Sequence, residues 1–322
     1  MADPVVLNPP TRVLVTGANG FVGDALCAEA YERGLSVRGA TRSACKLPHG
    51  VENVAVAAMN NTTDWRHALT GCSAVIHLAA RVHVMKESIA DPLAEFRRFN
   101  VHGTLNLARQ AATAGVRRFV FISSVKVNGE ATLPGQVFTA ADVPAPLDAY
   151  GVSKMEAEQG LRHIAEQTGM EVVIIRPPLV YGPGVKANFA AMVRWLRRGV
   201  PLPLGAIHNR RSLVALDNLV DLIVLCLTHP AAANQTFLVS DGEDVSTSDL
   251  LRRMGQAMGK PARLLPVPPS WLKVAAALVG KQEMAQRLCG SLQVDILKTR
   301  KLLGWVPSLG LDEGLARVVA DE

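Results

Sequence analysis

Short apolar runs alternate with amphipathic stretches through the first half of the chain. The amphipathic stretches, among them residues 93–114 and 150–168, have the apolar spacing of helices. The apolar runs are rich in β-branched residues, which is typical of buried strands. These expected strands cover residues 12–16, 35–41, 51–58, 74–78, 118–123 and 172–175. Strands that alternate with helices in this way predict an α/β fold with a doubly wound parallel sheet.

The pattern loosens after residue 178, where Pro and Gly interrupt it. We expect a helix over 188–198, one further strand over 237–239, and a helix after Ser246, which has the spacing of an N-cap box with Asp249. The chain should therefore form a sheet domain and a smaller, mostly helical lobe that binds the substrate. The expected limits are 11–178 for the sheet domain, with later returns near 206–240, and 179–205 with 241–322 for the smaller lobe.

A glycine-rich turn follows the first expected strand and opens the first expected helix. It reads Gly17-Ala18-Asn19-Gly20-Phe21-Val22-Gly23. Glycines permit positive φ and a close approach of the backbone to a ligand, and a helix N-terminus attracts a pyrophosphate. The alternative is a purely structural turn. The strand, turn and helix together predict a Rossmann-type dinucleotide site formed by Gly17, Gly20, Phe21, Val22 and Gly23.

The end of the second expected strand bears on the choice of nicotinamide cofactor. NAD-specific folds place an acidic residue there to bind the ribose hydroxyls, whereas this chain has Thr41 and Arg42. An arginine can pair with a 2′-phosphate, so NADP(H) is favoured as the cofactor, with NAD(H) as the alternative. An ordinary surface arginine would explain the residue equally simply.

The fourth expected strand ends in side chains that suit a flat ligand. Leu78, Ala79 and Ala80 would let a cofactor lie close to the sheet, although packing alone accounts for them equally well. His77, just before them, is expected to be a hydrogen-bonded core histidine rather than a catalyst.

Tyr150 and Lys154 stand four residues apart at the start of the helix expected over 150–168. Residues at this spacing share a helix face, so the phenol and the ammonium converge. A free phenol has a pKa near 10, and a nearby cation lowers it toward the working range. Ser124 ends the fifth expected strand on the side where ligands bind in such sheets. These residues predict a device for proton transfer at a carbonyl or hydroxyl, an exposed i,i+4 pair being the alternative.

Composition narrows the class of protein. The chain has 322 residues, 49% of them hydrophobic and 19% charged, which is typical of a folded protein. A net charge of +6 suits an anionic ligand, but its basic residues come as separated pairs, so no nucleic-acid partner is expected. No apolar run reaches the roughly 18 residues of a membrane span. The nearest, Trp271–Val279, should be a buried or interfacial helix.

The start of the chain and its cysteines bear on compartment. Residues 1–10 show neither the basic nor the apolar part of a signal peptide. Five cysteines are scattered without metal-ligand spacing, so we expect reduced thiols, no metal and a cytoplasmic protein.

Several motifs in order resemble those of the extended short-chain dehydrogenase/reductases, the family of NAD-dependent nucleotide-sugar epimerases, dehydratases and ketoreductases. The resemblance extends from Val13 to Val318. It rests on Gly17/Gly20/Gly23, His77-Leu78-Ala79-Ala80, Asn100, Ser123-Ser124, Tyr150/Lys154, Arg176-Pro177 and Leu303-Gly304-Trp305.

The resemblance implies roles for individual residues. Tyr150 would be the catalytic acid–base, Ser124 would hydrogen-bond the reacting oxygen, and Lys154 would bind the nicotinamide ribose and tune Tyr150. Pro177 would lie against the cofactor. Asn188, Arg211 and Lys126 would contact the UDP-sugar substrate, with a surface salt bridge as the alternative for Arg211. Family members pair two helices across a two-fold axis, so a homodimer is expected.

Departures from the family pattern select among its reactions. The 4,6-dehydratases carry an acidic pair where this chain has Val125 and Lys126, so dehydration is not expected. Asn128 replaces the usual Tyr before Gly129. This stretch most resembles reductases that make UDP-N-acetylquinovosamine-type sugars for surface polysaccharides. The expected reaction is therefore 4-ketoreduction of a UDP-4-keto-6-deoxy-N-acetylhexosamine. The alternatives are a UDP-glucose or UDP-N-acetylglucosamine 4-epimerase and, more remotely, a non-catalytic cofactor sensor.

Overall fold

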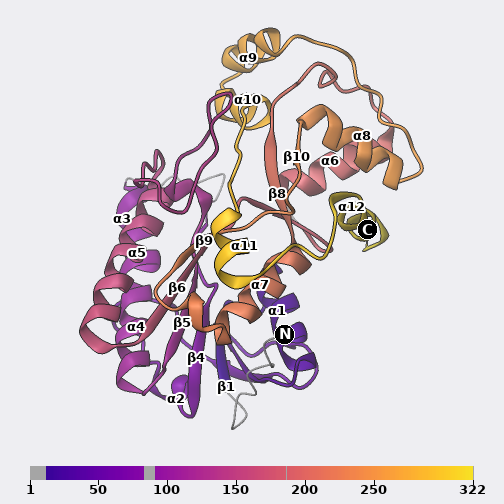
Figure 1. Cartoon of the computed structure of the whole chain (residues 1–322). Coiled ribbons are helices and arrows are strands. Elements are labelled where there is room, and N and C mark those ends of the chain that lie inside the picture. Colours follow the sequence, from indigo (N-terminus) through magenta and orange to yellow (C-terminus); the bar gives the residue numbers. More distant parts are fainter. Residues whose placement is uncertain (1–11, 83–90, 186, 322) are drawn as a thin grey trace.

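The computed structural model describes residues 12–82, 91–185 and 187–321, which contain a seven-stranded sheet with helices on both faces (Figure 1). Every neighbouring pair of strands in this sheet is parallel. The strand order is β3 (Glu52–Ala55), β2 (Ser36–Thr41), β1 (Arg12–Thr16), β4 (Cys72–His77), β5 (Arg118–Ile122), β6 (Glu171–Arg176) and β9 (Thr236–Leu238). The predicted doubly wound sheet is thus confirmed. The order reverses between β1 and β4, and ligands bind outside the carboxyl ends of strands at such a switch point.

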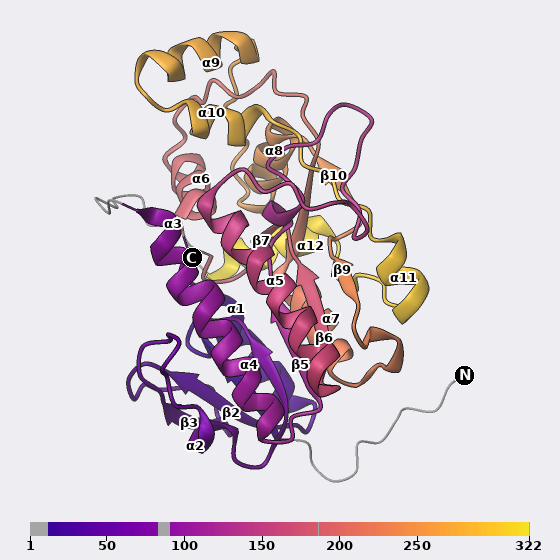
Figure 2. The ribbon, with the colours of Figure 1, turned by 90° about the vertical axis from the view of Figure 1, so that its left-hand side faces the viewer.

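Alternation along the strands builds two cores, one on each face of the sheet. In β1, Val13 and Val15 point to the core shared with α1 (Phe21–Glu32) and α7 (Leu216–Thr228), while Leu14 points to the other face. That face is covered by α2 (Arg66–Leu69), α4 (Thr104–Thr113) and α5 (Ala149–Thr168). Figure 2 shows α4 and α5 side by side across it.

The long helix expected over 93–114 is a continuous series of three helical segments. These are α3 (Pro92–Phe96), the π-helix η1 (Arg97–Gly103) and α4. Asn100 lies buried in the π-helical segment. Its amide accepts from the backbone nitrogen of Arg81 at 2.8 Å, and donates to the Arg81 carbonyl and to Ser153 Oγ, both at 3.0 Å. These bonds join the loop after β4 to η1 and to α5.

The smaller lobe contains a second sheet that the loosened sequence pattern did not reveal. Its strands are short: β7 (Leu179–Tyr181), β8 (Arg211–Ala215) and β10 (Asp244–Val245), in the order β10-β8-β7. Ser246 caps the next helix by accepting from the Asp249 nitrogen at 3.0 Å, as predicted. The helices of this part are α6 (Ala187–Arg198), α8 (Thr247–Ala257), α9 (Pro269–Leu278), α10 (Gln282–Cys289) and α12 (Leu311–Asp321), and α11 (Leu297–Leu303) packs beside β9. The domain limits themselves stay a prediction.

Among the described residues no helix is both long and apolar enough to cross a membrane. All five cysteines are free thiols.

Candidate active site

The turn between β1 and α1 leaves no space for a side chain at two of its glycines. Gly17 has a φ of 70°, and a Cβ there would lie 3.0 Å from the backbone nitrogen of Ala79. A Cβ at Gly23 would lie 2.1 Å from the Gly17 carbonyl oxygen. Gly20 begins α1 without a side-chain cap. The first amides of the helix, which belong to Phe21 and its neighbours, are therefore available to an anion such as a pyrophosphate.

Arg42 follows directly on the last residue of β2 and is exposed. Within the part of the chain that the structure describes, no hydrogen bond or ion pair engages its guanidinium. The preceding Thr41 is buried and donates to the Ser43 carbonyl at 2.9 Å. Arg42 is thus free to meet a ligand, but its contact with a 2′-phosphate stays a prediction.

The end of β4 is tied to the glycine turn through a buried histidine. His77 Nδ1 lies 2.7 Å from Thr16 Oγ1, and Nε2 lies 2.9 Å from Thr104 Oγ1. Thr16 Oγ1 also accepts from the Ala79 nitrogen at 3.2 Å. Burial, with a smaller effect of the Lys154 charge, lowers the pKa of His77 to about 3. The prediction of a hydrogen-bonded core histidine is confirmed. Residues 78–80 lie half-buried beside the turn.

The three predicted catalytic residues lie on elements that meet at the carboxyl end of the sheet. Ser124 follows β5 and begins the short 3-10 helix η2 (Val125–Val127), which packs on α5. Tyr150 is in the first turn of α5, with its ring 6.0 Å from that of Phe96. Lys154, one turn later, is 1% exposed, and its Nζ lies 4.1 Å from the centre of the Phe121 ring.

Burial perturbs both members of the Tyr150–Lys154 pair. It raises the pKa of Tyr150 to about 12, and the negative charge of Asp148 adds to this rise. It lowers the pKa of Lys154 to about 7, although the nearby Glu158 favours the charged ammonium. The expected lowering of the Tyr150 pKa is therefore not met by the chain alone, because burial and the Asp148 charge both oppose the phenolate. Burial leaves Lys154 about half charged at neutral pH.

Lys126 has an intramolecular partner that the sequence did not indicate. Its ammonium bonds to one carboxylate oxygen of Asp148 and lies 3.7 Å from Glu130. The other Asp148 oxygen accepts from the Gly151 nitrogen at 2.6 Å and so caps α5. Lys126 thus offsets a negative charge close to Tyr150, and its contact with the substrate stays a prediction.

A buried ion pair beneath the site was missed at the level of sequence. Glu158 accepts from Ser123 Oγ at 2.6 Å and from Arg176 Nε and Nη2 at 2.9 and 2.6 Å. Arg176 also donates to Asn128 Oδ1 at 3.0 Å. Glu158 stands four residues after Lys154 on the same face of α5, and this spacing was the signal that could have identified it. The network joins β5, β6 and α5 directly below the catalytic residues.

The remaining predicted contacts lie on both lobes. Pro177 is buried, and its carbonyl accepts from the Val125 nitrogen at 3.0 Å, which holds η2 in place. Arg211 Nη1 donates to the carbonyls of Arg287 and Gly290 at 2.7 and 3.2 Å, at the end of α10. The Asn188 side chain lies outside the described residues. Contacts of these residues with a ligand stay predictions.

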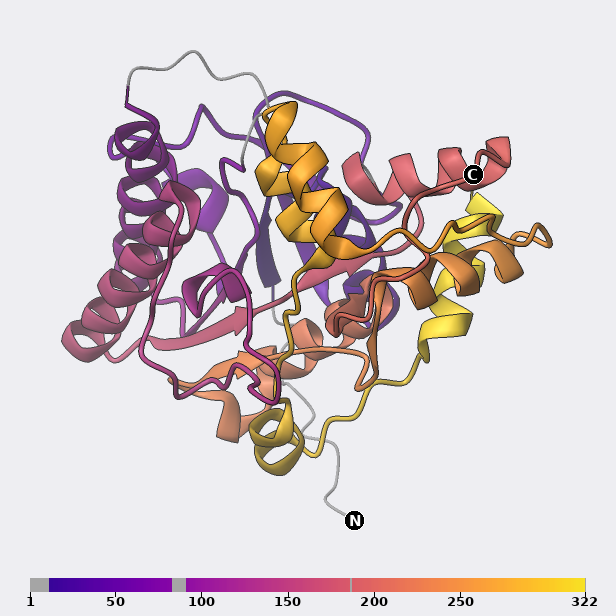
Figure 3. The ribbon, with the colours of Figure 1, turned by 90° about the horizontal axis from the view of Figure 1, so that it is seen from above.

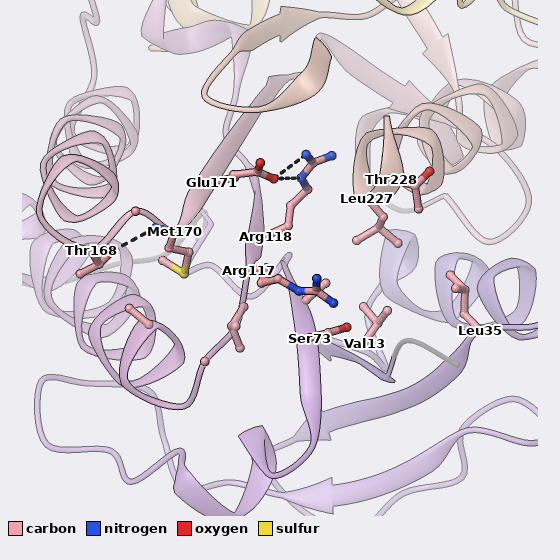
Figure 4. A pocket seen from close by; sticks show the side chains of 15 residues that line it. Val13, Leu35, Ser73, Arg117, Arg118, Thr168, Met170, Glu171, Leu227 and Thr228 are labelled. Atoms are coloured by element: carbon pink, nitrogen blue, oxygen red, sulfur yellow. Dashed lines mark hydrogen bonds and ion pairs between the residues drawn. The ribbon is translucent and has the colours of Figure 1, made fainter. Parts of the chain in front are cut away.

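A cavity of about 490 Å³ lies at the amino ends of the strands, opposite the catalytic residues (Figure 4). It is lined by residues at the starts of β1, β4, β5 and β6, so it is remote from the strand ends where Ser124 and Tyr150 lie. Its buried Arg118 donates to Glu171 at 2.9 Å and to the carbonyls of Cys226 and His229 at 2.9 and 2.8 Å. The Arg118 guanidinium therefore has its hydrogen-bond partners within the protein. The candidate catalytic residues lie at the other end of the strands, away from this cavity.

Comparisons with known proteins show the family to which the chain belongs. The model of the NAD dependent epimerase/dehydratase family matches residues 13–240. A UDP-glucose 4-epimerase of Vibrio cholerae is 50% identical over 307 residues, which cover 95% of this chain and 93% of the relative. The structure of MoeE5 in complex with UDP-glucose and NAD is 27% identical, has a TM-score of 0.76 and covers 96% of this chain and 97% of that one.

A UDP-N-acetylglucosamine 4-epimerase from Bacillus cereus has a TM-score of 0.80 at 19% identity, with 96% and 98% of the two chains covered, and so shows the shared fold. The family match over most of the chain and the 50% identity show that this protein is an enzyme of the NAD-dependent epimerase/dehydratase family, the extended short-chain dehydrogenase/reductases that its motifs resemble.

Proposed function

We propose that the enzyme is a UDP-hexose 4-epimerase that uses NAD. The observation that carries the proposal is buried Lys154, one helical turn after half-buried Tyr150 on α5, in a chain half identical to a UDP-glucose 4-epimerase over nearly its full length. This similarity favours epimerisation over the 4-ketoreduction expected from the sequence, which remains a prediction.

The residues divide the proton chemistry at C4 of the sugar. Ser124 hydrogen-bonds the C4 oxygen and holds it toward Tyr150. The Tyr150 oxygen accepts the C4 hydroxyl proton as the carbonyl forms, and returns it when the alcohol is restored on either face. Lys154 must be charged to favour the phenolate, and its pKa of about 7 places this protonation near neutral pH. The Lys126 ammonium offsets Asp148, whose charge opposes phenolate formation.

The glycine turn fits a dinucleotide, because its cradle excludes a Cβ at Gly17 and Gly23 and presents the open start of α1. Gly17, Gly20 and residues 21–23 would hold the pyrophosphate, residues 78–80 and Pro177 would border the rings, and Lys154 would bind the ribose. When bound, NAD supplies the hydride acceptor and donor at C4. NAD is favoured by the family description and by the MoeE5 complex, while exposed Arg42 remains the argument for NADP.

The test is to incubate the purified enzyme with UDP-glucose and no reductant, and to follow UDP-galactose formation by NMR. Epimerisation without net cofactor consumption is expected, because an epimerase reduces the keto sugar with the hydride that it removed. A Tyr150→Phe enzyme is the matched control, since it lacks only the hydroxyl. No C4 epimer from UDP-glucose or UDP-N-acetylglucosamine would contradict the proposal.

The second candidate is 4-ketoreduction of a UDP-4-keto-6-deoxy-N-acetylhexosamine, as in surface polysaccharide synthesis. It is supported by the stretch Val125-Lys126-Val127-Asn128, in which Lys126 stands where dehydratases carry an acid and Asn128 replaces Tyr. Loss of one NAD(P)H absorbance equivalent per keto sugar, with no epimerisation of either UDP-sugar, would establish this reaction instead.

A further inference from the structure

Helix α9 presents an apolar face to solvent. Trp271, Val274 and Leu278 are 71%, 62% and 84% exposed, at the i, i+3 and i+7 spacing of a single helix face. The opposite side carries half-buried Leu272, which packs on the core of the smaller lobe. No residue of α9 is buried. Of the two readings that the sequence left open for this apolar run, a buried helix is therefore wrong.

The helix stands at the rim of the molecule. In Figures 1 and 2 it is the outermost element beside α10, and Figure 3 shows this orange pair with no other element in front of it. Val279, directly after α9, and Met284 on α10 are 67% and 45% exposed. Exposed apolar side chains therefore also occur on the turn after α9 and on α10, which packs against α9.

Basic residues predominate in the segment that carries this face. Residues 260–290 contain five basic side chains and one acidic residue. Lys273, within α9, and Lys281, just after it, are exposed. An exposed tryptophan and aliphatic stripe flanked by lysines is the composition of a helix that lies in the interface of an anionic membrane, with its apolar side chains among the headgroups.

We propose that α9 docks the enzyme on an anionic phospholipid surface, through Trp271, Val274 and Leu278 in the interface and Lys273 and Lys281 against the headgroups. A second copy of the chain suits this face less well. The faces of the ten-residue α9 and the eight-residue α10 are about 15 Å and 12 Å long and about 10 Å wide, or roughly 270 Å² together, well below the roughly 800 Å² per partner of a stable interface. Pairing two copies would also bring two basic segments together.

The experiment is sedimentation of the full-length enzyme with vesicles of phosphatidylcholine alone, or of equal amounts of phosphatidylcholine and phosphatidylglycerol. Binding to the anionic vesicles only is expected. Trp271→Ser and Leu278→Ser should each weaken it by about tenfold, and Lys273→Glu by about fivefold or more. Because these side chains are exposed, the variants should keep the wild-type circular dichroism and melting temperature.

Matched controls lie on α11, which the views place far from α9. Leu297 is 53% exposed and Lys301 is exposed, so Leu297→Ser and Lys301→Glu repeat the same chemical changes and should bind like wild type. Equal loss in the controls, equal binding to both vesicles, or no binding to either would overturn the proposal. So would a doubled mass in light scattering that Trp271→Ser abolishes, because α9 would then join two copies. Each readout is independent of the sugar reaction.

Discussion

Replacing Lys154 by Met should make the folded enzyme more stable while it abolishes most turnover. Lys154 is 1% exposed, and no described carboxylate lies within salt-bridge distance of its ammonium. Burial disfavours the charged form and lowers the pKa from 10.5 to about 7. Burial of the charged ammonium therefore lowers the free energy of unfolding, although catalysis needs this charge. Met fills a similar space without a charge.

The magnitude follows from the two pKa values. Each pKa unit corresponds to about 1.4 kcal/mol, so at pH 7, where the folded group is about half charged, burial costs about 4 kcal/mol. The Phe121 ring, 4.1 Å from Nζ, recovers about 1 to 2 kcal/mol by a cation–π contact. We expect Lys154→Met to raise the free energy of unfolding by about 3 kcal/mol at pH 7.

The two pKa values of Lys154 also determine how its effect on the free energy of unfolding changes with pH. Between the folded pKa of about 7 and the unfolded value of 10.5, the unfolded chain binds more protons, so this group makes the wild type more stable as pH rises. The difference between variant and wild type should therefore shrink from about 3 kcal/mol at pH 7 to about 1 kcal/mol at pH 9.5.

Urea unfolding of both proteins at these two pH values measures the effect, since other titrating groups are shared and cancel in the difference. Lys301→Met, at an exposed position, is the control and should change neither value. A variant less stable than wild type at pH 7, or a difference that does not change with pH, would refute the reasoning. Turnover and cofactor affinity should fall in Lys154→Met only, because stability and function oppose each other at this residue.

Three further predictions concern the site and the assembly. Tyr150→Phe should keep its cofactor affinity, measured by fluorescence titration, while turnover falls by about 10²- to 10⁴-fold, and full activity would remove the proposed acid–base. Arg42→Asp should weaken NADPH binding far more than NADH binding; equal affinities in the wild type that the variant leaves unchanged would show that Arg42 does not read the 2′-phosphate. Light scattering at micromolar concentration should give twice the 34.4 kDa chain mass if this chain, by the analogy drawn from its sequence, pairs the helices of residues 93–114 and 150–168 across a two-fold axis, and a monomer would contradict this analogy.

Local sequence patterns were sufficient to predict the features that depend on residues close together in the chain. The strands and helices of the main sheet follow from the alternation and spacing of apolar residues, and the Ser246 cap follows from a three-residue pattern. The glycine turn and the Tyr150–Lys154 pair could also be read directly, because backbone freedom and a one-turn helix spacing involve residues close in the chain. The resemblance to the family rested on these same residues, and its fold and class were confirmed.

Pairing between distant residues was decided by the tertiary structure alone. Lys126 meets Asp148 across 22 residues, Ser123 meets Glu158 across 35, and Arg176 meets Asn128 across 48. Nothing in the local sequence distinguishes such a partner from any other polar residue, so the sequence indicates neither the Asp148 partner of Lys126 nor the ion pair of Glu158.

The sequence also did not predict which side chains would be buried and which exposed. The spacing of Tyr150 and Lys154 indicated attraction between the two groups, but desolvation opposes charge on both and raises the pKa of one while lowering the pKa of the other. The short strands of the second sheet gave too few positions for a readable alternation. The apolar run Trp271–Val279 predicted a helix, and only its place at the rim of the molecule left that helix exposed.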